Sequence, residues 1–85
     1  MDTKFSLEGV DGNAFAVMGY TRDCMRSCAR DAREVGDMAN ADKFGAIAQS
    51  DYVKLAMSGS YDKLLAVSYK VIEECNKFYE EQEAS

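Results

Sequence analysis

Apolar residues recur at helical spacing through the last third of the chain, and this pattern constrains the fold more than any other feature. Ser60 can cap a helix that starts at Tyr61, directly after the helix-breaking pair Ser58-Gly59. Such a pattern predicts a long helix with one face buried. The stripe consists of Tyr61, Leu64, Leu65, Ser68, Val71, Ile72, Cys75, Phe78 and Tyr79.

Two further helical segments precede this one. The first is expected from about Ala14 to Val35, where Gly36 ends it. Residues 37–57 show a less regular helical pattern, which we interpret as one helix with Gln49 as the candidate position for a break. Because the chain contains no proline, glycine is its main helix breaker.

The N-terminal segment has a different period. Polar and apolar residues alternate from Lys4 to Glu8, which is typical of a half-buried strand. Gly9 and Gly12 then allow a turn, and Asn13 can cap the first helix. The expected fold is therefore mostly α, with one short N-terminal β-strand followed by about three helices.

This predicted strand has no partner in its own chain. An isolated strand exposes unpaired backbone groups and is not stable, so pairing with the same strand of another copy is the simplest completion. The sequence therefore predicts a homo-oligomer, a dimer or a tetramer. The alternative is that residues 3–8 are an ordered, unpaired arm that lies on the helices.

Length and charge narrow the class of protein. The 85 residues fit one small domain, residues 1–85, whose limited core favours self-association. A formal charge of −5 disfavours binding to DNA or RNA, which requires a basic face. No apolar run approaches the roughly 20 residues of a membrane span. The first residues lack a signal-peptide pattern and three cysteines cannot all pair internally, so we expect a reducing cytoplasm.

The composition argues against catalysis. The chain has no histidine, so it cannot form a Ser-His or Cys-His nucleophile pair. Cys24, Cys28 and Cys75 fall short of a structural zinc set, and we expect them to be small buried residues. The sequence therefore predicts a protein that is not an enzyme and that carries no metal or cofactor.

The bend from Gly9 to Asn13 is a candidate anion site. A glycine-containing turn that leads into a helix N-terminus leaves backbone N–H groups directed outward at the positive end of the helix dipole. This arrangement often holds phosphate groups. The alternative is a well-capped junction without a ligand, since every connection into a helix needs turn residues.

All four arginines lie on the first predicted helix. Arg30 and Arg33 each have an acidic residue four positions later, and Arg26 has Asp23 three positions earlier. Arg22 has no acidic residue three or four positions away. Arg22 is therefore the arginine most available to a ligand.

Two tyrosines are candidates for stacking on a base. Tyr20 lies early in the first helix, and Tyr61 opens the last one beside Asp62, so each can offer a flat surface near a helix N-terminus. The alternative is that tyrosines on the apolar stripes belong to the core, with only the hydroxyl reaching water.

Two segments carry a family resemblance. LEGVDGNAFAVMG, residues 7–19, and AMSGSYDKLL, residues 56–65, resemble small phage proteins that begin with a strand-DGNAF-helix element. Functionally assigned members are similar to anti-CBASS sponge proteins, which assemble as oligomers and sequester cyclic nucleotide signals of bacterial immunity. In this chain the section between Gly36 and Ser58 is longer than in that family.

The residue patterns and the resemblance together predict a phage immune-evasion protein in the host bacterial cytoplasm, which binds cyclic di- or oligonucleotides without hydrolysing them. Phosphate or ribose would contact Gly12, Asn13 and Arg22, and a base would stack on Tyr20 or Tyr61. Asp11 or Asp62 would accept from base edges or fix the turn. The alternatives are a small acidic module that inhibits a host protein, and an enzyme that degrades the signal. The predicted site consists of Asp11, Gly12, Asn13, Tyr20, Arg22, Arg26, Tyr61 and Asp62.

Overall fold

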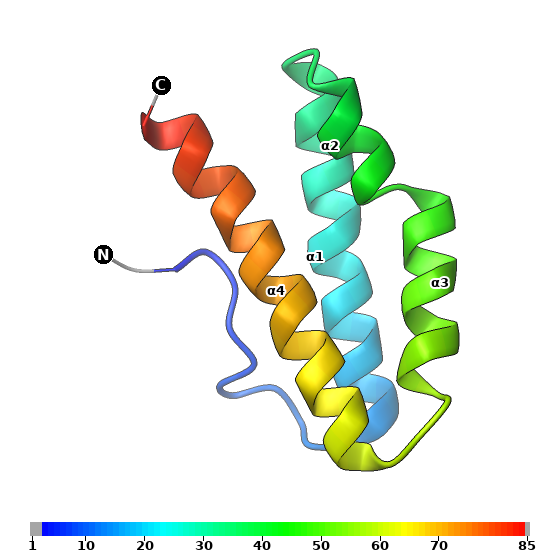
Figure 1. Ribbon diagram of the computed structural model, residues 1–85. Coiled ribbons are helices and arrows are strands. Elements are labelled where there is room, and N and C mark those ends of the chain that lie inside the picture. The colour runs from blue at the N-terminus through cyan, green and yellow to red at the C-terminus, as the bar shows by residue number, and fades with distance from the viewer. Residues whose placement is uncertain (1–2, 85) are drawn as a thin grey trace.

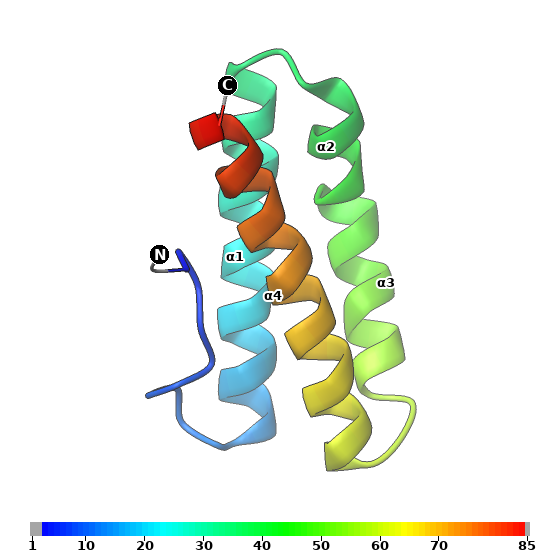
Figure 2. The same cartoon turned by 60° about the vertical axis from the view of Figure 1, so that its left-hand side comes forward.

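The structure is a computed structural model that describes residues 3–84, and these residues form helices and loops without any strand. The helices are α1 (Ala14–Glu34), α2 (Met38–Lys43), α3 (Ala46–Ala56) and α4 (Tyr61–Ala84). The two long helices α1 and α4 pack along each other, and α2 and α3 cover a second side of α1 (Figures 1 and 2). No helix in residues 3–84 is both long and apolar enough to cross a membrane.

The core lies where α1 and α4 meet. The stripe predicted for the last helix is confirmed in its centre, because Leu64, Ile72 and Phe78 are almost fully buried. Two polar side chains are also fully buried and are hydrogen-bonded, as burial requires. The Thr21 hydroxyl donates to a carbonyl one turn earlier at 2.8 Å, and Ser68 shares a 2.6 Å hydrogen bond with the hydroxyl of Tyr52.

The middle of the chain forms two helices, so the prediction of a single helix over residues 37–57 is wrong. The break falls at Phe44-Gly45, before the expected position at Gln49. Phe44 is buried in the core at the end of α2. The next residue is Gly45, where a Cβ would lie only 3.0 Å from the Ala41 carbonyl oxygen of α2, so the break favours glycine. The Gln49 amide donates to the Phe44 carbonyl at 3.0 Å, which satisfies a group that the break leaves free.

The N-terminal strand is the second wrong prediction. The Asn76 side chain of α4 accepts from the Phe5 N–H and donates to the Phe5 carbonyl, both at 2.9 Å. The Ser6 N–H donates to the Tyr20 hydroxyl of α1 at 3.0 Å. Side chains therefore satisfy backbone groups that a neighbouring strand would have paired, and Leu7 anchors the segment in the core.

Residues 3–12 are thus an ordered arm that runs along α1 and α4 (Figures 1 and 2). Tyr79 holds the start of this arm: its ring contacts Phe5 edge to face at 5.7 Å, and the Lys4 ammonium lies 4.5 Å from the ring centre. The arm removes the need for a strand partner. The prediction of a homo-oligomer then depends only on the family resemblance and the small size of the domain.

Candidate functional site

The bend before α1 brings two distant parts of the predicted site together. The Asp11 carboxylate accepts from the Asn13 N–H at 3.0 Å, and the Asn13 side chain caps α1 by accepting from the Phe15 N–H at 2.8 Å. The Tyr61 hydroxyl donates to the Gly12 carbonyl, which joins the bend to the start of α4. These bonds engage one side-chain oxygen each of Asp11 and Asn13, and whether the N–H groups of the bend hold an anion stays a prediction.

Two residues of α1 that were predicted to contact the same ligand, Tyr20 by stacking and Arg22 through phosphate, lie on different sides of the helix. Tyr20 and Arg22 are two residues apart, which places them about 200° apart around the helix axis. The Tyr20 hydroxyl is engaged by the arm, and partial burial raises the pKa of this phenol. Tyr20 therefore belongs to the arm contact, and the structure does not bring it to Arg22.

Two other predicted residues lie on the surface. Arg26 pairs with Asp23 at 2.9 Å, as their spacing predicts, and both side chains are largely exposed. Asp62 is exposed in the first turn of α4, where a negative charge is favourable to the helix dipole. Neither residue shares a cavity with Arg22.

Arg22 lines a groove of about 420 Å³ between α1 and α3. Its Nε is buried and has no hydrogen-bond partner within residues 3–84, and it forms no ion pair there. A buried donor without a partner is costly, and more so on a charged group. The groove therefore holds a guanidinium whose hydrogen-bonding capacity the chain itself does not use.

Helix α3 supplies the other wall of this groove. Ser50 and Lys54 lie one turn apart on it, so a hydroxyl and an ammonium line the same groove as Arg22. The groove begins at the first turn of α3, where the N-cap Gly45 provides no side-chain cap. The residues that line the groove include two cations and no carboxylate, which suits an anion.

Sequence reasoning missed the α3 wall of the groove. The pattern over residues 37–57 predicts one helix with a candidate break at Gln49, so it does not place the start of α3 at Ala46. The spacing of Ser50 and Lys54 is a signal for a shared face, but only the tertiary structure places that face against Arg22. The full lining is Arg22, Ala46, Gln49, Ser50, Val53 and Lys54.

An exposed apolar surface lies next to the bend. Phe15 is 76% exposed, and Met57 is 64% exposed. Both border a hollow of about 230 Å³ together with Tyr61. Phe15 precedes Arg22 by seven residues, which puts the two on nearly the same face of α1 about 10 Å apart.

The three cysteines are buried and reduced, as predicted for small core residues. Burial raises the pKa of the Cys24 thiol to about 11. Cys28 and Cys75 lie against each other between α1 and α4, and the Cys28 thiol is 3.8 Å from the Cys75 carbonyl oxygen. Residues 3–84 contain no group of three or more candidate ligands placed to hold a metal ion.

Comparisons of the chain with protein-family models, with curated proteins and with solved structures find no match. The resemblance to anti-CBASS sponge proteins therefore stays a prediction, and the geometry of the Arg22 groove is the strongest structural guide to function.

Proposed function

We propose that this chain binds a cyclic nucleotide through the groove between α1 and α3 and sequesters it without hydrolysis. The observation that carries the proposal is the buried, unpartnered Nε of Arg22. A phosphate group suits the Arg22 guanidinium as a whole, because its oxygens accept charge-assisted hydrogen bonds from this cation. Lys54 and Ser50 would complete the contacts to the same phosphate.

The bases would lie toward the exposed ring of Phe15. A nucleobase placed there would gain stacking and would cover apolar surface that the chain leaves open. Tyr61, which borders the same hollow, keeps its predicted role beside the base. This arrangement moves the proposed binding site from the bend itself to the α1 face that extends from Phe15 to Arg22.

A cyclic dinucleotide has two phosphates, whereas each chain supplies one Arg22 groove. A second copy could supply the contacts to the second phosphate, which would favour the predicted dimer or tetramer. Native mass spectrometry with cyclic di-AMP tests this part. A complex of two or four chains with bound nucleotide is expected, and a ligand-bound monomer would contradict the shared site.

The first experiment is a thermal unfolding assay with cyclic di-AMP, cyclic di-GMP and cyclic GMP-AMP. A ligand at about 100 times its dissociation constant stabilises the folded protein by roughly 2.7 kcal/mol. Removing one charge-assisted contact costs about 1.5–3 kcal/mol, so Arg22→Gln should weaken binding roughly ten- to hundredfold. Arg33→Gln, an exposed change near the end of the same helix, should leave the affinity unchanged.

An unchanged affinity in Arg22→Gln would overturn the site assignment. If none of the three nucleotides raises the melting temperature, the small acidic module that inhibits a host protein becomes the better explanation. In that case the charge of −5 would steer the chain toward a basic partner.

The absence of hydrolysis needs its own test, because a serine and a lysine one turn apart can act as a nucleophile pair. After incubation with cyclic di-AMP, the protein is digested with a protease and the recovered nucleotide is weighed by mass spectrometry. Intact cyclic di-AMP supports sequestration. A linear product that disappears in Ser50→Ala would show a degrading enzyme instead.

A further inference from the structure

A second cavity lies on the other side of α3 from the Arg22 groove. It has a volume of about 570 Å³ and opens between α3 and α4. Its inner side is formed by nearly buried residues, and its walls are partly exposed. The apolar lining consists of Met25, Phe44, Ala48, Tyr52, Leu55, Val67 and Val71.

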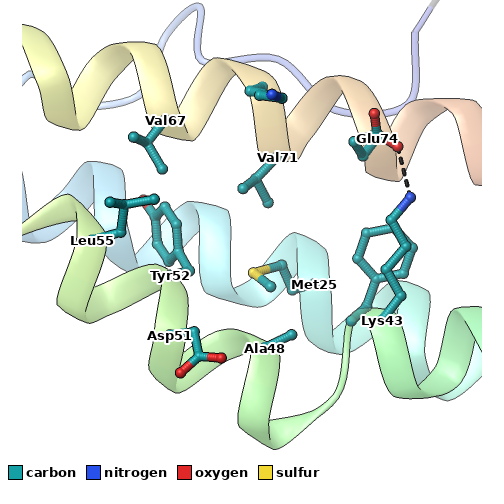
Figure 3. Close-up of a pocket in the computed structure, with 11 residues that line it drawn as sticks. Met25, Lys43, Ala48, Asp51, Tyr52, Leu55, Val67, Val71 and Glu74 are labelled. Carbon is teal, nitrogen blue, oxygen red and sulfur yellow. Dashed lines mark hydrogen bonds and ion pairs between the residues drawn. The ribbon is translucent and has the colours of Figure 1, made fainter.

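The interior of this cavity offers apolar contacts and few free polar groups. Met25 lies between Ala48 of α3 and Val71 of α4, and the Tyr52 ring lies near Leu55 and Val67 (Figure 3). The Tyr52 hydroxyl already shares its hydrogen bond with Ser68. A volume in this range and an apolar lining are typical of small-molecule sites. The occupant must therefore have an apolar body.

One end of the cavity carries the ion pair of Lys43 and Glu74. The Lys43 ammonium lies 2.7 Å from the Glu74 carboxylate (Figure 3). Lys70, one turn before Glu74 on α4, also lines the cavity and forms no ion pair inside residues 3–84. Lys43 lowers the pKa of Glu74, with smaller contributions from Lys77 and Lys70. Two lysines and one glutamate therefore line this part of the cavity, which leaves one positive charge there although the whole chain carries a charge of −5.

The lining contains one more charged residue, Asp51, and its negative charge does not face the lysines. The Asp51 carboxylate is directed away from α4, outside the gap between the two helices (Figure 3). The cavity thus combines an apolar channel with a cationic end. A ligand that matches it has a hydrocarbon body and one anionic head.

We propose that the cavity between α3 and α4 binds a small amphipathic carboxylate of the medium-chain fatty acid class. The tail lies on Met25, Val67 and Val71, and the carboxylate lies at Lys70 beside the Lys43–Glu74 pair. Binding covers Leu55, which is 48% exposed in the free chain. This site is separate from the Arg22 groove, because α3 presents different residues to each.

The test uses the full chain with labelled methyl groups, titrated with decanoate below its micelle concentration and followed by nuclear magnetic resonance. Saturable shifts are expected at the methyl groups of Met25, Val67 and Val71. Met38 and Met57, which are exposed elsewhere, should not shift. No shift at Met25, or equal shifts at all three methionines, would overturn the proposal. Decan-1-ol has the same tail without the carboxylate and should bind severalfold more weakly than decanoate. Equal binding of the two compounds would show that the site does not recognise an anionic head.

Variants separate the two parts of the site. Ala48→Phe fills the cavity and should abolish the decanoate shifts, whereas Ile47→Phe, on the 80% exposed neighbouring position, should keep them. Lys70→Gln should weaken decanoate binding severalfold without changing decan-1-ol binding, and the matched change Lys63→Gln should affect neither.

Two further results distinguish decanoate from a cyclic nucleotide and from a protein partner. Arg22→Gln should bind decanoate as the original chain does, so loss of cyclic nucleotide binding and loss of decanoate binding are distinguishable. Shifts at the cavity with an amphipathic helical peptide, together with none with decanoate, would overturn the proposal in favour of a protein partner.

Discussion

The two sides of α1 are covered in different ways. On one side, α1 packs against α4 and the N-terminal arm, and the Asn76 side chain pairs with backbone groups of the arm, although hollows of about 460 and 300 Å³ remain between the arm and α4. On the other side, α3 leaves a groove on each of its flanks, one polar and one apolar. The first side holds the molecule together. The second leaves Arg22 unpartnered and apolar walls open, so the candidate ligand sites gather there.

The largest difference should appear when the same change is made on each side. Leu64 on α4 is 3% exposed and Leu55 on α3 is 48% exposed. Leu64→Ala should lower the free energy of unfolding by about 2–5 kcal/mol, because it leaves a cavity in the core. Leu55→Ala should cost less than about 1 kcal/mol, because water already reaches this side chain. Urea unfolding measures both, and equal losses would refute the contrast between the two sides.

The arm should respond to the loss of its clamp. Asn76→Ala removes both hydrogen bonds to Phe5 and leaves partly buried backbone groups unpaired, which should cost about 1–3 kcal/mol. Hydrogen exchange at the Phe5 amide should accelerate as the arm detaches. Asn76→Asp keeps the acceptor for the Phe5 N–H and loses the donor, so it should have an intermediate effect. Unchanged exchange in Asn76→Ala would show that Leu7 and Tyr79 hold the arm by themselves.

These contacts explain which parts of the fold were predictable from sequence. The helices α1 and α4 have regular apolar stripes and clear caps, so Asn13 and the stop at Gly36 were correctly identified. The arm has the alternation of a strand, but its partner is the Asn76 side chain, 71 residues away along the chain. No local pattern reports such a contact. The break at Gly45 was missed because it depends on the burial of Phe44.

The candidate site was predictable only in part, for a related reason. The lack of a local carboxylate identified Arg22 correctly as unpaired, since ion pairs within a helix are set by sequence spacing. The partners Ser50 and Lys54 come from another helix, and their position depends on how α3 packs. The 76% exposure of Phe15 likewise depends on how the helices pack around the start of α1 and not on its apolar character.

A change at Gly19, on the α1 face between Phe15 and Arg22, should stabilise the protein slightly. It lies within α1 between Phe15 and Arg22, and a Cβ placed on it meets no atom of the chain within 4 Å. Gly19→Ala should therefore raise the free energy of unfolding by about 0.5–1 kcal/mol, because alanine is the better helix former. If cyclic di-AMP lies along this face, the same change should weaken its binding. Higher stability with unchanged binding would place the nucleotide elsewhere.

The smallest effect concerns the pH dependence of the arm side. The Tyr79 hydroxyl donates to the Asp31 carboxylate, and this hydrogen bond, with help from Arg30, holds the pKa of Asp31 below its usual range. A carboxyl group whose pKa is lower in the folded state stabilises the protein above its unfolded pKa, and that contribution is lost as the pH falls through the folded value.

Tyr79→Phe removes the main cause of the lowered pKa of Asp31. Its loss of stability relative to the original chain should therefore be larger at neutral pH than in acid, where Asp31 is protonated in both proteins. Urea unfolding across this range measures the difference, and Asp23→Asn, which alters an exposed pair on the same helix, serves as the control. A Tyr79→Phe deficit that is the same at every pH would mean that the hydroxyl stabilises the protein through its hydrogen bond with Ser27 and not through the charge of Asp31.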